Sequence, residues 1–224
     1  MITKKKTHLR NLAEILSGVY EKTDPDGEIA YLQTKDCTDE VIIKYASRVL
    51  LTAKMQKNLL QEGDILFASK GVNYLSVVFR EQEKAVASTS FFVIRLKSPV
   101  VTPEYLCWFL RQPSIKAYFK SNQAGSATPL IHKPAVENLE IPVPSLEEQK
   151  TIVAIARLSK RAMELQQAII EKKQTIVQQL LMYNPQIQIS AESETKRSIF
   201  REKDKTKRSK KESAQHSKSR NKSF

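Results

Sequence analysis

The sequence has little cysteine, little glycine and no long apolar run. Its 224 residues include five glycines and two cysteines, Cys37 and Cys107. Two isolated thiols without Cys-x-x-Cys spacing predict neither a disulfide framework nor a zinc site, and they favour a reduced, cytoplasmic setting. No apolar stretch approaches the ~18 residues that cross a bilayer. No apolar segment follows the basic residues Lys4–Lys6, so we expect neither a signal peptide nor a membrane partner.

Signatures of catalysis are missing as well. The sequence contains no Gly-x-x-x-x-Gly-Lys phosphate loop, no glycine-rich cofactor turn and no Asn-Pro-Pro-Tyr-like or Asp-Pro-Pro-Tyr-like stretch. His8, His132 and His216 are scattered, which indicates neither a metal site nor a catalytic triad. Two Glu-x-Lys stretches, Glu148–Lys150 and Glu171–Lys173, fall in a predicted helix rather than on a strand. We therefore expect a protein that is not itself an enzyme and that has no cofactor and no metal.

The positive charge is concentrated at one end. The net charge is +13, and residues 195–224 hold 12 Lys/Arg against 3 Asp/Glu, which leaves only +4 for the rest. A basic segment with so little apolar content predicts a disordered tail, which we place at residues 185–224. This tail either binds phosphates without sequence preference, with a steep salt dependence, or only keeps the chain soluble.

The longest predicted helix lies in the second half of the sequence. Prolines keep residues 141–144 extended, and Ser145 and Glu148 have the spacing of a capping box. No Gly or Pro interrupts Glu147–Tyr183, and Asn184-Pro185 ends the pattern. A helix of this length is roughly 55 Å long at 1.5 Å per residue.

One face of this helix is apolar. Its members recur at three- and four-residue steps, as in a coiled-coil seam: Ile155, Leu158, Ala162, Leu165, Ile169, Ile176 and Leu180. Lys172 interrupts the seam, so a strict two-stranded zipper is a poor match. The helix either packs along its own domain or pairs with another chain, and we favour the intermolecular pair.

The residues before this helix mix strands and helices irregularly, which predicts an α+β domain. The predicted organisation is a domain at residues 1–143, the long helix at 144–184 and the tail at 185–224. We expect strands at Ile29–Leu32, Val41–Ile43, Ile65–Ala68 and Phe91–Leu96, and a hairpin of Leu75–Phe79 with Val86–Ser88. We expect helices or helical turns at Leu9–Gly18, Pro103–Arg111, Ser114–Lys120 and Lys133–Leu139.

Several short motifs occur in an order that is specific only as a set. They are Leu9-x-x-Leu-Ala-Glu-Ile with Gly18, Gly63–Leu66 leading to Gly71, Ile94–Leu96, Pro103–Leu106, Gly125-Ser126, Leu139–Pro144, Glu147–Gln149 and Ile152-Val153. With these motifs the chain resembles the target-recognition half of the DNA-specificity (S) subunit of type I restriction–modification systems. The resemblance covers roughly residues 9–183. The basic tail lies outside the family pattern.

The resemblance implies a recognition domain that reads a short half-site in the major groove of double-stranded DNA. In this family, long helices set the distance between half-sites and dock methyltransferase (M) subunits, which act with restriction (R) subunits. Family members usually hold two recognition domains and two helices, whereas this sequence has one of each, so it resembles a half-subunit. Two copies are then expected to form a homodimer through residues 147–183 and to read a bipartite palindrome with a fixed spacer.

Two predicted loops supply side chains suited to base edges and phosphates. The loop after the Ile65–Ala68 strand carries Ser69, Lys70, Asn73 and Tyr74, and the loop around Gly125 carries Asn122, Gln123, Ser126, Thr128, His132 and Lys133. Many of these residues fit equally well as ordinary solvated loop positions. Arg48 and Arg80 are further candidates outside the two loops.

Two other classes of protein fit the same sequence. One is a coiled-coil adaptor whose domain does not read DNA, and the other is a free-standing DNA-binding regulator that owes most of its affinity to the tail. Removal of residues 195–224 separates the three: sequence preference survives in a specificity subunit, binding collapses in the regulator, and the adaptor discriminates between no sequences.

Overall fold

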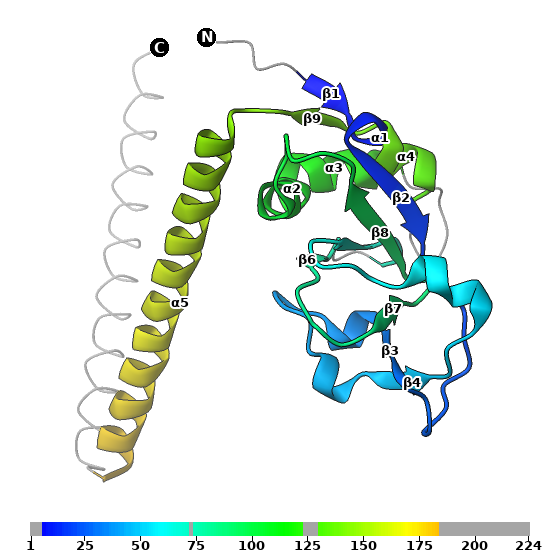
Figure 1. Cartoon of the computed structure of the whole chain (residues 1–224). Helices are drawn as coiled ribbons and strands as arrows, with labels where there is room; N and C mark the ends of the chain where they lie inside the picture. Colours follow the sequence, from blue (N-terminus) through cyan, green and yellow to red (C-terminus); the bar gives the residue numbers. More distant parts are fainter. Residues whose placement is uncertain (1–5, 72–73, 123–129, 184–224) are drawn as a thin grey trace, which may run out of the picture. The chain divides into compact units, whose positions relative to one another are not determined.

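The computed structural model describes residues 6–71, 74–122 and 130–183 (Figure 1). The chain divides into two units, Met1–Ser159 and Lys160–Phe224. The first unit holds the sheets, the short helices and the first turns of the long helix α5 (Leu146–Tyr183). The described part of the second unit is the remainder of α5. The mixture of strands and helices in the first unit confirms the predicted α+β class.

A four-stranded antiparallel sheet organises the first unit. Its strands, in spatial order, are β2 (Ala13–Ser17), β8 (Phe91–Leu96), β5 (Ile65–Ala68) and β6 (Ser76–Val78). The prediction of β8 as a central strand is confirmed, since it pairs with β2 on one side and β5 on the other. Ile94 is opposite both Ile15 and Ile65, so side chains of the same face are aligned across three strands.

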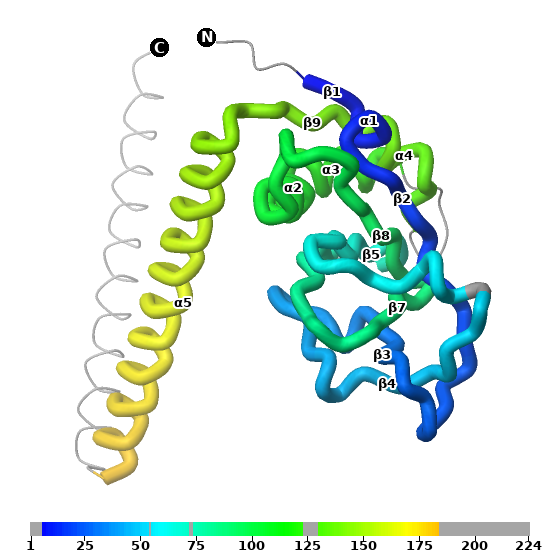
Figure 2. The backbone as a smooth tube through the Cα atoms, viewed as in Figure 1, coloured from blue at the N-terminus to red at the C-terminus, as the bar shows by residue number. Residues whose placement is uncertain are grey.

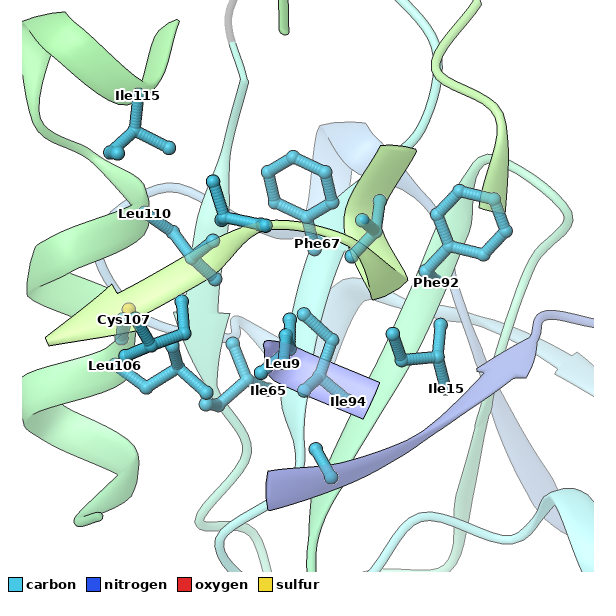
Figure 3. Packing of buried hydrophobic residues seen from close by; sticks show 14 of the residues in the cluster. Leu9, Ile15, Ile65, Phe67, Phe92, Ile94, Leu106, Cys107, Leu110 and Ile115 are labelled. Atoms are coloured by element: carbon cyan, nitrogen blue, oxygen red, sulfur yellow. The ribbon is translucent and has the colours of Figure 1, made fainter. Parts of the chain in front are cut away.

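Two helices cover one face of this sheet. They are α2 (Pro103–Leu110) and α3 (Pro113–Ser121), each with proline in its first turn. The predicted cap of α2 is confirmed, because the Thr102 hydroxyl accepts a hydrogen bond from the Tyr105 amide at 3.3 Å. Figure 3 shows the core between the layers, where Ile15, Ile65, Phe67, Phe92 and Ile94 of the sheet meet Leu106, Cys107, Leu110 and Ile115 of the helices and Leu9.

A second sheet packs on the opposite face of the first. It consists of β4 (Ser47–Val49), β3 (Ile29–Leu32) and β7 (Ala85–Ala87), with β3 antiparallel to β4 and parallel to β7. Leu66 and Val93 point to this side because side chains alternate along a strand, and they share a core with Leu32 of β3. Short 3₁₀ turns at Thr34–Asp36, Ile43–Tyr45 and Ala53–Asn58 connect and flank these strands (Figure 2).

A small sheet joins the start of the domain to its end. Strand β1 (Lys6–His8) pairs antiparallel with β9 (Glu140–Pro142). They are neighbours of the short helices α1 (Leu9–Leu12) and α4 (Lys133–Glu137), and the Leu9 amide donates to the Leu139 carbonyl at 2.9 Å. The chain enters α5 directly after β9, so α5 starts at the point where both ends of the domain are held together.

Three predicted elements differ from the structure. Leu9–Gly18 is not one helical turn: helix α1 ends at Leu12 and strand β2 follows. Position 18 requires glycine because the backbone at Ser88 lies very close to it: a Cβ atom at position 18 would be 2.0 Å from the Ser88 carbonyl oxygen. Val41–Ile43 is not a strand, since it makes one isolated bridge to Cys37 and then enters a 3₁₀ turn.

The predicted hairpin is also wrong, although both of its strands exist. β6 pairs with β5, and β7 pairs with β3 instead of returning along β6. Two backbone hydrogen bonds extend the first pairing beyond the strands: the Phe79 amide donates to the Asp64 carbonyl at 2.7 Å, and the Gly63 amide donates to the Phe79 carbonyl at 2.9 Å. The charged segment after Phe79 therefore crosses from one sheet to the other.

The start of α5 has the predicted capping box. The Glu148 amide donates to the Ser145 hydroxyl at 3.3 Å, and the Ser145 amide donates to the Glu148 carboxylate at 2.9 Å. The helix begins at Leu146 and continues to Tyr183, which confirms the predicted long helix to within one residue.

Candidate nucleic-acid interface

The two predicted DNA-facing loops meet at the end of β5. The Ile131 amide donates to the Ser69 carbonyl at 2.8 Å, and Lys70 forms an antiparallel bridge with Leu130. The segment that returns from the second loop is thus hydrogen-bonded to the start of the first. Candidates that are about 60 residues apart in sequence are brought to one end of the four-stranded sheet.

Ser69 and Tyr74 are packed into the domain. The Ser69 amide and hydroxyl both donate to the Ser90 carbonyl, at 2.8 and 3.1 Å, which ties the end of β5 to the turn before β8. The Tyr74 ring stacks on Phe119 of α3, with centroids 6.2 Å apart, and is 7% exposed. This burial favours a supporting role for both residues, in which they hold the loop between them.

Tyr74 also has an unusual backbone. Its φ of +44° lies in the left-handed region, which residues with a Cβ rarely adopt. Such a conformation persists only when surrounding contacts hold it, and the Phe119 stack supplies one. The contact of Tyr74 with the domain core therefore fixes the backbone where the chain leaves this loop.

Three of the candidates are exposed and lie around this junction. Lys70 follows Ser69 directly, and His132 and Lys133 follow Ile131 at the start of α4. Lys133 is 3.7 Å from Glu137 one turn later, an exposed pair that leaves the ammonium accessible. Asn122 caps α3: its side-chain amide donates to the Tyr118 carbonyl at 2.8 Å. Asn122 as a whole is exposed.

The remaining loop candidates, Asn73, Gln123, Ser126 and Thr128, lie outside the described residues. The two further candidates, Arg48 and Arg80, are ion-paired with Glu83 and Glu104 respectively. Their guanidinium groups are thus already engaged, which makes them weaker candidates for phosphate contacts than Lys70.

Sequence reasoning missed two cations on α3. Ile115 and Phe119 are buried one turn apart, so Lys116 and Lys120, each one position later, are on the exposed side. The Tyr118 hydroxyl donates to the Ala135 carbonyl at 3.0 Å, which holds α3 against α4. The spacing of the two apolar residues was the available signal for this basic helix face.

Buried polar groups inside the domain stabilise its fold. Arg95 of the Ile94–Leu96 motif donates from Nε and Nη2 to the two carboxylate oxygens of Asp64 in the Gly63–Leu66 motif, at 2.8 and 2.7 Å. This hydrogen bonding raises the pKa of Arg95. Burial raises the pKa of Cys37 to about 12 and also raises that of Cys107, so both remain neutral thiols.

The described residues contain neither a metal-binding cluster nor a membrane-spanning helix. No group of three or more His, Cys, Asp or Glu side chains is arranged to hold a metal ion among residues 6–71, 74–122 and 130–183. In the same ranges, no helix is both long and apolar enough to span a membrane.

The predicted seam of α5 is exposed along its whole length. Its larger members, Ile155, Leu158, Leu165, Ile169, Ile176 and Leu180, are between 48% and 71% exposed. Ala162 is exposed as well. α5 is therefore an amphipathic helix whose apolar seam, from Ile155 to Leu180, is not covered by the described part of the chain.

Comparison with known proteins gives one family. The sequence model described as "Type I restriction modification DNA specificity domain" matches residues 3–174. A curated relative, the type I restriction enzyme MjaVIII specificity subunit of Methanocaldococcus jannaschii, is 29% identical over 130 residues, which are 58% of this chain and 28% of the relative.

Solved structures share the fold. A chain from a structure on complex assembly and conformational transition of the type I R-M system matches with a TM-score of 0.58 and 18% identity, over 77% of this chain and 42% of that one. The HsdS subunit from Thermoanaerobacter tengcongensis matches with a TM-score of 0.55 and 18% identity, over 75% and 40%. The chain therefore spans less than half the length of each of these three relatives.

Proposed function

Because the chain belongs to the family of type I restriction–modification DNA specificity domains, we propose that it is the DNA-reading subunit of such a system. The observation that carries the proposal is the extent of the family match, which runs through the domain and beyond the start of α5 to residue 174. Residues 1–143 act as the target-recognition domain, and residues 144–184 act as a dimerisation and spacer helix.

The DNA-reading surface in this proposal is centred on the junction of the two loops. Lys70, His132 and Lys133 are exposed beside the hydrogen bond that joins Ser69 to Ile131. Cations here contact phosphates, and polar residues of the same loops reach base edges. Lys116 and Lys120 extend the positive charge along α3. This placement supports a single interface built from both loops.

The partner of α5 in this proposal is a second copy of the chain. The seam from Ile155 to Leu180 needs an apolar surface of similar length, and a second α5 provides one. A two-fold homodimer presents the same recognition surface twice in inverted orientation, so its target is a bipartite palindrome with a fixed spacer. Separate methyltransferase and restriction subunits, docked on the helices, then supply the catalysis, and this chain has none.

The experiment is a genome-wide map of adenine methylation in the source cell, with and without the gene. We expect deletion to remove methylation at one bipartite palindromic motif, and the intact gene to restore it. Loss of an asymmetric motif would keep the specificity function but contradict the homodimer. An unchanged map in cells whose methyltransferase subunits are expressed would contradict the proposed function itself.

A further inference from the structure

Gln149 differs from every other residue of α5. It lies in the second turn of the helix and is 0% exposed, and it is the single buried residue between Leu146 and Tyr183. Apolar neighbours at Ile152 and Val153 are only partly buried against the domain core. The most deeply buried attachment of α5 to the domain is thus a polar side chain.

Three of the four hydrogen-bonding positions of its side-chain amide are used. Gln149 Oε1 accepts from the Thr102 amide at 2.8 Å, and Nε2 donates to the carbonyls of Val100 and Pro144 at 2.8 and 2.9 Å. The opposite orientation of the side-chain amide would place its oxygen against two carbonyls and its NH₂ against an N–H donor. The surroundings therefore select one orientation of the side chain.

The partners of Gln149 are themselves firmly placed. Thr102 caps α2 through the Tyr105 amide, and the Tyr105 hydroxyl donates to the Pro142 carbonyl at 2.9 Å, just before α5. α2 packs on the four-stranded sheet. Gln149 consequently connects the first turns of α5 to the start of α2 and to the chain leaving β9.

Apolar packing alone would attach a helix without fixing its direction closely, because it is non-directional. Three hydrogen bonds to backbone groups on two sides require defined distances and angles. A buried glutamine at this position is therefore better suited to fix the orientation of α5 than to increase the free energy of its attachment to the domain.

We propose that Gln149 is a positioning residue that fixes the direction in which α5 leaves the recognition domain and thereby sets the spacing between the two DNA half-sites. The spacing part rests on the proposed function. From Gln149 to Tyr183 a rigid helix extends roughly 50 Å at 1.5 Å per residue. A tilt of about 10° at Gln149 would move its far end by about 9 Å, or between two and three base pairs at ~3.4 Å each.

The first test measures direction without DNA. Spin labels on the full-length Glu28→Cys/Gln178→Cys protein, diluted with unlabelled chain, report the distance between the domain and α5, since both sites are exposed and the native cysteines are buried. We expect Gln149→Met and Gln149→Glu to widen this distance distribution at least twofold. The matched changes Gln174→Met and Gln174→Glu, at an exposed position of the same helix, leave it unchanged.

The second test measures spacing. Duplexes with two half-sites and spacers that differ by one base pair are titrated with each variant. The unchanged protein and the Gln174 variants should prefer one spacer by about tenfold over its neighbours, and both Gln149 variants should reduce this ratio to about threefold or less. Affinity for a duplex with a single half-site should stay within twofold, which a damaged domain would not allow.

The outcomes separate the two proposals. An unchanged distance distribution in a Gln149 variant that unfolds cooperatively would overturn the positioning role. A wider distribution with an unchanged spacer preference would overturn its link to spacing. If the unchanged protein has no spacer preference, the dimeric function fails and takes the spacing part with it, while the label distances alone decide whether Gln149 fixes the direction of α5. Gln149→Met introduces no buried charge, so it serves if Gln149→Glu does not fold.

Discussion

The recognition domain and α5 use the same apolar residue types in opposite ways. In the domain, Leu106 is 0% exposed between α2 and the sheet, whereas Leu165 on α5 is 48% exposed. Both lie in helices with an apolar face, so the period of the sequence alone does not distinguish them. The difference is the presence of a covering layer within the chain. Apolar residues of the domain stabilise its fold, and those of α5 are available to another molecule.

The polar groups show the same contrast. The Arg95–Asp64 pair is largely buried and bidentate, with Asp64 2% exposed. The pairs on α5, such as Arg161 with Glu164 at 3.5 Å, are exposed and contribute little. The Arg95–Asp64 pair therefore ties two neighbouring strands of the central sheet together, whereas the pairs on α5 lie on the surface of the helix.

The largest effect is expected from breaking the buried ion pair. Arg95→Met leaves the Asp64 carboxylate buried without its partner, which should lower the free energy of unfolding by about 3–5 kcal/mol. Arg161→Met on α5 should change it by less than about 0.5 kcal/mol. Urea denaturation followed by circular dichroism measures both. Equal effects would show that the pair in the domain is no more important than an exposed one.

A matched pair of leucine truncations comes next. Leu106→Ala creates a cavity in the domain core and should lower the free energy of unfolding by about 3 kcal/mol. Leu165→Ala should change domain unfolding by less than about 0.5 kcal/mol. It should instead weaken self-association about tenfold, or ~1.4 kcal/mol, as measured by sedimentation equilibrium. A fully monomeric parent protein would contradict the second half of this prediction.

Replacing Lys172 tests the seam of α5 with a change that should strengthen self-association rather than weaken it. Lys172 interrupts the seam of α5, and a polar residue at such a position costs stability of the pair. Lys172→Leu should therefore strengthen self-association by about tenfold, or ~1.4 kcal/mol, with no change in the unfolding of the domain. Lys173→Leu, one position away and outside the seam, is the control. If both variants associate equally, the seam is not the contact surface.

Local signals predicted the local elements. Ser145 and Glu148 located the start of α5, Thr102 located the start of α2, and the apolar run Phe91–Leu96 identified the central strand. Each depends on residues a few positions apart, which a sequence displays directly. The motif Gly63–Leu66 was recognisable for the same reason.

Long-range pairings were not predictable in this way. The strand after Phe79 crosses to β3 because of a parallel partner more than 50 residues earlier, and no local pattern marks that choice. In the candidate interface, Ser69 and Tyr74 have polar atoms like their exposed neighbours, yet Ser90 and Phe119 hold them in the interior. Loop composition predicted the region of the candidate interface, and only the folded contacts separated buried from exposed residues within it.

The smallest effect tests which of the two regions contacts DNA. Lys70 is exposed at the junction of the two loops, so Lys70→Gln should weaken binding to a specific duplex about three- to fivefold, or roughly 0.6–1 kcal/mol. If its ammonium neutralises one phosphate, the slope of log K against log salt should become shallower by about 0.9. Lys173→Gln on α5 removes the same charge from the other region and should leave both quantities unchanged. Filter binding at several salt concentrations measures them. A shallower slope for Lys173→Gln with none for Lys70→Gln would move the phosphate contacts from the loops to the helix.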